Sequence, residues 1–165
     1  MTRVHALPDE AATLALGAGL AASLPRPSAG LLVTLDGELG AGKTTLVRAL
    51  LRGLGHDGPV PSPTYTLVEP YDAGGHGVTH VDLYRVADES ELEFLGWDDL
   101  RSTMLLVEWP ERAPGLTSSA DLHVELRYLA TEAEAGAGRE ARLTPASQRA
   151  LEWLERADAF IRIDS

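Results

Sequence analysis

The stretch Gly37-Glu38-Leu39-Gly40-Ala41-Gly42-Lys43-Thr44 decides the fold, because it fits the phosphate-loop pattern G-x-x-x-x-G-K-[ST] at every fixed position. In this pattern backbone N–H groups surround the phosphates of a nucleotide, and the lysine reaches the β- and γ-phosphates. Lys43 is the only lysine in a chain whose Lys and Arg residues number 14. A compact ammonium fits such a tight cup, whereas a planar guanidinium is bulkier. The motif therefore predicts a nucleoside triphosphate site.

The residues on both sides of this motif agree with it. Residues 31–35 (Leu-Leu-Val-Thr-Leu) form a short apolar run that is typical of a buried strand. Between Thr44 and Leu54 apolar residues recur on one face of a helix, and Arg48 and Arg52 lie off that face. A phosphate loop joins a strand to a helix in this way. The alternative, a glycine-rich turn before an unrelated helix, does not require this agreement.

The rest of the chain predicts one α/β domain over residues 1–165, of the P-loop NTPase type, with a mixed β-sheet flanked by helices. We expect helical segments over residues 8–24, 89–100 and 146–159. We expect two hairpins and one single strand, over residues 64–71 with 78–84, 121–129 with 139–143, and 104–109.

Composition sets limits on location and partners. The chain has no cysteine, which excludes disulfides and thiolate metal sites and agrees with a reducing compartment. No apolar run approaches the ~20 residues that span a bilayer, so we expect a cytoplasmic protein without membrane contact. The net charge of −11 argues against direct nucleic-acid binding, which requires a basic surface. A role beside nucleic acid then needs a partner that supplies that surface.

Two carboxylates complement the loop. Hydrolysis by a phosphate-loop protein requires Mg²⁺, held by the loop hydroxyl and a carboxylate. Thr44 supplies the hydroxyl, while Asp82 and Glu108 each lie at the end of a predicted strand. Two solvated carboxylates at strand ends are the alternative interpretation.

Several further residues are compatible with more than one role. Residues 62–66 (Ser-Pro-Thr-Tyr-Thr) are compatible with two interpretations, a switch loop around the γ-phosphate and a simple turn into a strand, and the spacing favours neither. Trp109 follows Glu108, and its strand-end position favours the core over a lid or a partner contact. Four arginines are candidates to face the phosphates: Arg85, Arg112, Arg139 and Arg142. Four histidines without metal-ligand spacing are expected at the surface: His5, His56, His76 and His123.

Four motifs together carry a family resemblance, and they occur in order at residues 37–45, 62–67 (Ser-Pro-Thr-Tyr-Thr-Leu), 80–85 (His-Val-Asp-Leu-Tyr-Arg) and 106–110 (Leu-Val-Glu-Trp-Pro). With residues 91–96 and 138–142, they make the chain resemble the TsaE (YjeE) family over roughly residues 7–145. These are small bacterial ATPases of the tRNA threonylcarbamoyladenosine pathway. Glu38 stands where aspartate is commoner in the family, which preserves the charge.

The resemblance implies an ATPase that uses ATP and Mg²⁺ and supports turnover of the TsaB–TsaD complex, so that tRNA is met only through that complex. It implies that Lys43, Asp82 and Glu108 are catalytic, that Thr44, Glu108 and Asp82 serve the metal, and that Trp109 matters for activity. The nucleotide contacts implied are Thr13, Leu39, Gly40, Ala41, Gly42, Lys43, Thr44 and Thr45.

Three other classes of protein share parts of this pattern. A regulatory GTPase reads guanine with an Asn-Lys-x-Asp loop, which a chain with one lysine cannot contain. A small-molecule kinase shares the loop but needs a substrate pocket and an arginine-bearing lid, and no clear lid segment is present. A nucleotide-dependent interaction module with negligible turnover shares every binding residue.

Overall fold

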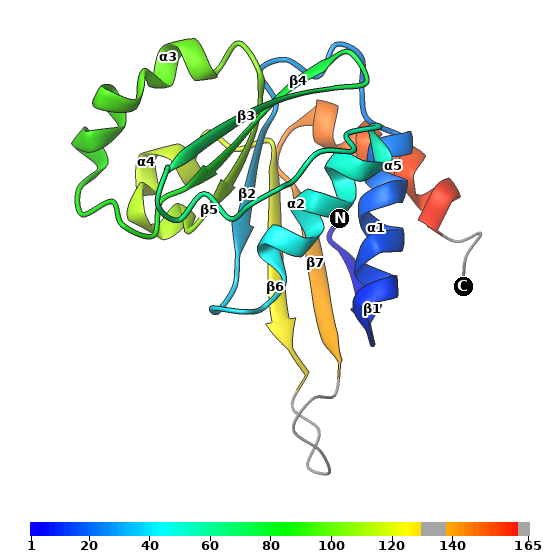
Figure 1. The fold of residues 1–165 in the computed structure, drawn as a ribbon. Coiled ribbons are helices and arrows are strands. Elements are labelled where there is room, and N and C mark those ends of the chain that lie inside the picture. The colour runs from blue at the N-terminus through cyan, green and yellow to red at the C-terminus, as the bar shows by residue number, and fades with distance from the viewer. Residues whose placement is uncertain (130–137, 162–165) are drawn as a thin grey trace.

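The computed structural model describes residues 1–129 and 138–161, which form a seven-stranded mixed sheet with helices on both faces (Figure 1). Across the sheet the strand order is β1-β7-β6-β2-β5-β4-β3. The strands are β1 (Arg3–Leu7), β2 (Leu32–Asp36), β3 (Val68–Ala73), β4 (His76–Asp82), β5 (Met104–Glu108), β6 (Leu122–Tyr128) and β7 (Arg139–Pro145). The predicted mixed α/β sheet is confirmed.

Parallel strands form the centre of this sheet and antiparallel strands form its two edges. Strand β2 pairs in parallel with β5 and β6, and β4 pairs in parallel with β5. The two predicted hairpins, β3–β4 and β6–β7, are present, and β1 pairs with β7 at one edge. Parallel pairing aligns the carboxyl ends of β2, β4 and β5 at one edge of the sheet, which is where α/β proteins bind ligands.

Long helices cover one face and short helices cover the other (Figure 1). The long ones are α1 (Glu10–Ala22), α2 (Lys43–Gly53) and α5 (Gln148–Ile161). The short ones are η1 (Glu89–Leu95), α3 (Trp97–Leu100), η2 (Pro110–Arg112) and α4 (Pro114–Thr117). Side chains alternate between the two cores, so Val33 and Leu106 face the long helices while Leu32 and Leu105 face the short ones. None of the helices in residues 1–129 and 138–161 has the length and apolarity to cross a membrane.

Helices α1 and α2 approach closely because small residues line their contact. A Cβ atom at Gly17 would lie 2.3 Å from the Cβ of Ala49, which is closer than two carbon atoms can approach. Side-chain volume at Gly17 would therefore push α2 away from α1. Because α2 begins at the phosphate loop, this contact also fixes the position of the loop.

Two details differ from the sequence predictions. Strand β1 was not predicted, because a five-residue segment has little periodicity and acquires its partner only when β7 is in place. The strand predicted from residue 64 starts at Val68. Before it, the N–H of Leu67 donates to the carbonyl of Pro63 over 2.7 Å and closes a turn. The predicted turn between residues 129 and 139 includes residues 130–137, which lie outside the described part of the chain.

Candidate nucleotide-binding site

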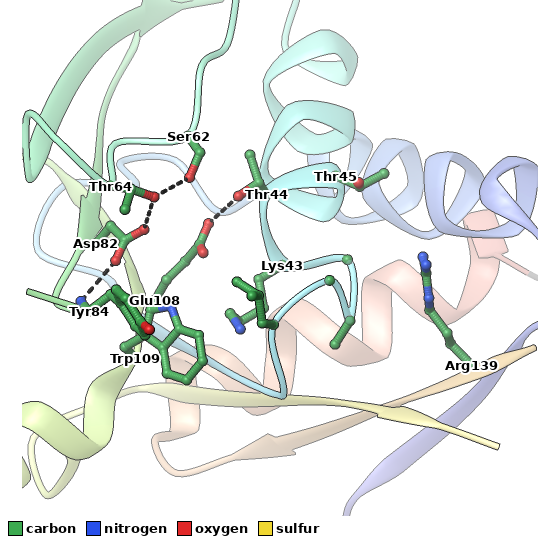
Figure 2. A pocket seen from close by; sticks show the side chains of 14 residues that line it. Lys43, Thr44, Thr45, Ser62, Thr64, Asp82, Tyr84, Glu108, Trp109 and Arg139 are labelled. Atoms are coloured by element: carbon green, nitrogen blue, oxygen red, sulfur yellow. Dashed lines mark hydrogen bonds between the residues drawn. The ribbon is translucent and has the colours of Figure 1, made fainter. Parts of the chain in front are cut away.

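A cavity of about 260 Å³ lies over the phosphate loop, at the carboxyl ends of the central strands. It is lined by the loop and the first residues of α2, by the two carboxylates and by residues from four other segments (Figure 2). The lining residues are Leu39, Gly40, Ala41, Gly42, Lys43, Thr44, Thr45, Ser62, Thr64, Asp82, Tyr84, Glu108, Trp109 and Arg139.

The loop leaves β2 and enters α2 through two glycines in left-handed conformations. Gly40 has φ 78° and Gly42, the N-cap of α2, has φ 106°, both values that side-chain-bearing residues rarely adopt. No side chain caps the start of α2, so the N–H groups of its first turn have no side-chain acceptor. A helix N-terminus with free N–H groups and a positive dipole end is suited to bind phosphate.

Lys43 is buried at the centre of the site, with 4% of its surface exposed. Its Nζ donates hydrogen bonds to the carbonyls of Gly37 and Glu38 and lies 3.9 Å from the centre of the Trp109 ring. Burial lowers the pKa of Lys43, while negative charges, that of Glu108 above all, oppose this decrease. The ammonium lies beside the phosphate loop at the N-terminus of α2, from where it can reach phosphate oxygens.

Glu108 lies beside the first turn of α2. It is the last residue of β5, is 3% exposed, and is paired in register with Asp82 of β4. The hydroxyl of Thr44 donates to Oε1 of Glu108 over 2.8 Å. The expected juxtaposition of the loop hydroxyl with a strand-end carboxylate is thus present.

Asp82 is also buried and connects the site to the segment predicted as a switch loop. Its Oδ1 accepts a hydrogen bond from the N–H of Tyr84 (2.9 Å), and its Oδ2 accepts one from the Thr64 hydroxyl (3.1 Å). The hydroxyls of Thr64 and Ser62 are 2.9 Å apart (Figure 2). Burial raises the pKa of Asp82, and the nearby charge of Glu108 raises it further, whereas both hydrogen bonds lower it. A chain of hydroxyls therefore couples residues 62–64 to Asp82.

His80 is a site residue that the sequence analysis did not single out. Its side chain is fully buried, and its Nε2 lies 2.7 Å from Oε1 of Glu108, so Nε2 carries the proton of this hydrogen bond. The Nδ1 atom has no partner among the described residues. The sequence contained one indication of this position: His80 and Asp82 are two residues apart in a predicted strand, so their side chains lie on the same face of β4.

Trp109 lines the cavity and also packs against the core on the short-helix face. Its side chain is half-buried, its backbone has a left-handed φ of 60°, and its ring lies 4.9 Å from that of Tyr84. Its strand-end position favoured the core, and the ring does pack in part against the core on the short-helix face. In addition, the left-handed backbone turns the ring toward Lys43. A non-glycine residue in this conformation is strained, and such strain concentrates at functional sites.

The remaining predicted contacts divide into two groups. Leu39, Gly40, Ala41, Gly42 and Thr45 line the cavity with Lys43 and Thr44, whereas Thr13 does not. Thr13 is 1% exposed in α1, and its hydroxyl has no hydrogen-bond partner within the described residues.

Of the four candidate arginines, only Arg139 lines the cavity. Arg85 lies over the ring of Tyr65 and Arg112 over that of Tyr84, while Arg142 forms an ion pair with Glu140 over 3.6 Å.

His76 corrects one further expectation. It was predicted at the surface, but it is 4% exposed, with Nδ1 2.6 Å from the Ser28 hydroxyl. Burial lowers its pKa, and Arg26 adds to this effect.

The end of the cavity that Asp82 and Glu108 line, called the inner end below, has a donor set that suits Mg²⁺. Thr44, Glu108 and Asp82 provide oxygen atoms only, and Mg²⁺ prefers oxygen ligands, water and nucleotide phosphates. Within residues 1–129 and 138–161, no group of three or more His, Asp or Glu side chains is arranged to hold a metal ion by itself. These residues therefore fit a metal ion that is also bound by phosphate.

Comparison with known proteins agrees with this geometry. The family model described as "Threonylcarbamoyl adenosine biosynthesis protein TsaE" matches residues 7–141. The crystal structure of Bacillus subtilis YdiB has the same fold, with a TM-score of 0.72 at 24% identity over 100% of this chain and 97% of that one.

Two similar proteins are both named tRNA threonylcarbamoyladenosine biosynthesis protein TsaE. The one from Haemophilus influenzae is 46% identical over 126 residues, which are 74% of this chain and 80% of that protein. The one from Nostoc sp. is 36% identical over 150 residues, which are 88% of this chain and 86% of that protein. The chain therefore belongs to the TsaE family.

Proposed function

We propose that this protein is a cytoplasmic, Mg²⁺-dependent ATPase of tRNA threonylcarbamoyladenosine biosynthesis, and that it acts on a TsaB–TsaD complex to support its turnover. The family, which is named for threonylcarbamoyl adenosine biosynthesis, supports the pathway. The observation that carries the chemistry is the hydrogen bond from Thr44 of the phosphate loop to the buried carboxylate of Glu108. It brings the two protein groups that serve Mg²⁺ in phosphate-loop hydrolases to one end of the cavity.

The chain's own groups bind the triphosphate. The free N–H groups at the start of α2 surround the phosphates, and the ammonium of Lys43 turns from the carbonyls of Gly37 and Glu38 to the β- and γ-phosphate oxygens. The ring of Trp109 lies against this ammonium and limits the access of water to it. Thr44 and Glu108 hold the metal, which when bound neutralises the charge on the β- and γ-phosphates.

Asp82 positions the attacking water. Its carboxylate is held by Tyr84 and Thr64 and lines the same cavity as Glu108. A fixed carboxylate accepts a hydrogen bond from water and orients its lone pair toward the γ-phosphate. Thr64 lies in the segment between α2 and β3 and is hydrogen-bonded to Asp82. A change at the γ-phosphate position therefore reaches this segment through Asp82, as in a switch loop.

The rim of the cavity favours a protein partner. Leu39 in the loop is 79% exposed, and Tyr65, next to Thr64, is 82% exposed. Large apolar side chains beside a nucleotide site are suited to a docking surface that depends on the nucleotide. A net charge of −11 is poorly suited to holding tRNA, so the tRNA is bound by the partner complex.

An ATPase assay with and without TsaB and TsaD tests this proposal. Phosphate release that increases when both partners are added supports it. Phosphate transferred to a metabolite would instead indicate a small-molecule kinase, and tight ATP binding without turnover in either condition would indicate an interaction module. A pull-down with ADP or a non-hydrolysable ATP analogue then shows which nucleotide state binds the partners.

A further inference from the structure

Arg139 lies at the opposite end of the cavity from the carboxylates. It is the first residue of β7, and Figure 2 shows it on the far side of the loop and the start of α2 from Asp82 and Glu108. Its Nη1 lies 3.2 Å from the position that a Cβ of Gly42 would take. The guanidinium therefore lies close beside Gly42, where the loop becomes α2.

The surroundings of Arg139 leave its positive charge available to an anionic ligand. Its guanidinium lies over the ring of Tyr128, 5.5 Å from the ring centre. The hydroxyl of Tyr128 in turn lies 3.0 Å from the position that a Cβ of Gly40 would take, so ring and guanidinium together border the loop. Within residues 1–129 and 138–161, no carboxylate forms an ion pair with Arg139, although the chain carries 25 acidic residues.

The direction of a bound nucleotide follows from the residues at the other end. Lys43 and Thr44 define where the β- and γ-phosphates lie, because the loop lysine reaches those phosphates and the loop hydroxyl serves the metal beside Glu108. The α-phosphate and the nucleoside then lie away from Glu108. That is the side on which Arg139 is found.

We propose that Arg139, held in place by Tyr128, is the α-phosphate anchor of this site. The inference rests on the proposed function insofar as it requires a bound nucleotide. An arginine at this end contacts ATP and ADP alike, because both contain the α-phosphate. It contributes to ground-state affinity and not to stabilisation of the transition state at the γ-phosphate. It also retains ADP after hydrolysis, so Arg139 slows release of the product.

The test compares nucleotide affinities of the wild type with those of Arg139→Ala, Arg139→Lys and Arg142→Ala, measured by calorimetry. Loss of a charge-assisted hydrogen bond predicts about 10- to 100-fold weaker binding of both ATP and ADP by Arg139→Ala. Arg139→Lys keeps the charge and is expected to recover part of this loss. Arg142 lies on the same strand but is paired with Glu140, so Arg142→Ala is the matched control and is expected to bind as the wild type does.

Two outcomes would overturn the anchor. One is an Arg139→Ala protein with wild-type affinity for both nucleotides. The other is a protein with unchanged affinity for ADP and strongly reduced turnover, which would make Arg139 a transition-state residue. A wild type that binds no nucleotide would contradict the proposed function itself, and the anchor with it. If Arg139→Ala fails to fold, Arg139→Lys decides: weaker binding of ATP and ADP by the same factor supports the anchor, whereas wild-type affinity for both nucleotides, or weaker binding of ATP alone, overturns it.

Discussion

The two ends of the cavity are constructed in opposite ways. At the inner end the charged groups Lys43, Asp82 and Glu108 are each no more than 4% exposed, and all three are hydrogen-bonded to fixed partners. At the outer end Arg139 is half-buried, lies over a single aromatic ring and has no carboxylate partner among the described residues. A buried, hydrogen-bonded end is preorganised to stabilise developing charge, whereas a looser, solvated end is suited to hold a ligand. This difference supports the proposal that the inner end carries the chemistry and the outer end retains the nucleotide.

Substitution of Lys43 is expected to have the largest effect, because its ammonium is the buried positive charge of the inner end and lies beside the phosphate loop. Lys43→Ala removes the ammonium that we propose contacts the β- and γ-phosphates, so we expect nucleotide binding below the range measurable by calorimetry. Arg48→Ala is the control, since Arg48 lies one turn further along α2 and donates to the carbonyl of Val60. Wild-type affinity in Lys43→Ala would contradict the assignment of this lysine.

Substitution of Glu108 tests the inner end of the cavity without changing the outer end. Glu108→Ala removes a preorganised charge from the inner end, which corresponds to ~3 kcal/mol or more, or more than about 100-fold in turnover. Binding of ADP in the absence of metal is expected to remain near the wild-type level, because the loop and Arg139 are unchanged. Wild-type hydrolysis by this variant would exclude the assigned role.

His80 is expected to contribute less, because it acts through Glu108. Outer-shell partners of metal ligands are worth about 10- to 100-fold, so His80→Gln is expected to lower kcat by about tenfold and to leave the ADP affinity unchanged. His123→Gln is a matched control, since His123 bonds to Thr34 outside the cavity. A purely structural role for His80 would instead lower the melting temperature and weaken ADP binding together.

Asp82 is a site residue whose buried carboxylate is also expected to lower the stability of the protein at neutral pH. Its pKa is raised in the folded protein, so deprotonation favours the unfolded chain, and this penalty is present at neutral pH and disappears as pH falls below the ordinary value of about 4. We therefore expect Asp82→Asn, without metal or nucleotide, to melt a few degrees higher than the wild type at pH 7 and to lose this advantage near pH 3.5. A lower melting temperature at pH 7 would show that the hydrogen bonds from Tyr84 and Thr64 outweigh the burial of the charge.

The smallest effect is expected from a buried group far from both ends. The pKa of His76 is lowered in the folded protein, so its contribution to stability is complete above about pH 6.5 and is lost as pH falls through its folded value. His76→Asn is expected to reduce the fall in melting temperature between pH 7 and pH 5 without changing nucleotide affinity. An unchanged pH profile would show that other groups, such as His5, account for that fall.

The sequence predicted the inner end of the site better than the outer end. Lys43 and Thr44 belong to a contiguous motif, and Glu108 ends an apolar strand, so local patterns were sufficient to find them. The choice of Arg139 over Arg142 depends on which face of β7 meets the loop, and that is determined by pairing with β6 and β1.

Two further features could be found only in the folded structure, because they also depend on contacts between separate segments of the chain. The turn at residues 64–67 forms because Pro63 and Thr64 find partners at Leu67 and Asp82. The role of His80 depends on the side-by-side pairing of β4 with β5, two strands that are separated in the sequence by η1 and α3.

The contacts of Lys43 with its own loop have a consequence for the ATPase cycle. Since the ammonium is already satisfied by two carbonyls and an aromatic ring, nucleotide binding is an exchange of one set of contacts for another, and only the difference contributes to affinity. In the proposed ATPase cycle the same carbonyls and ring would compete with ADP for the ammonium after loss of the γ-phosphate. If the proposed function and the proposed role of Arg139 hold, the loop would weaken the binding of ADP and Arg139 would strengthen it, and the balance between the two would determine how long ADP stays bound.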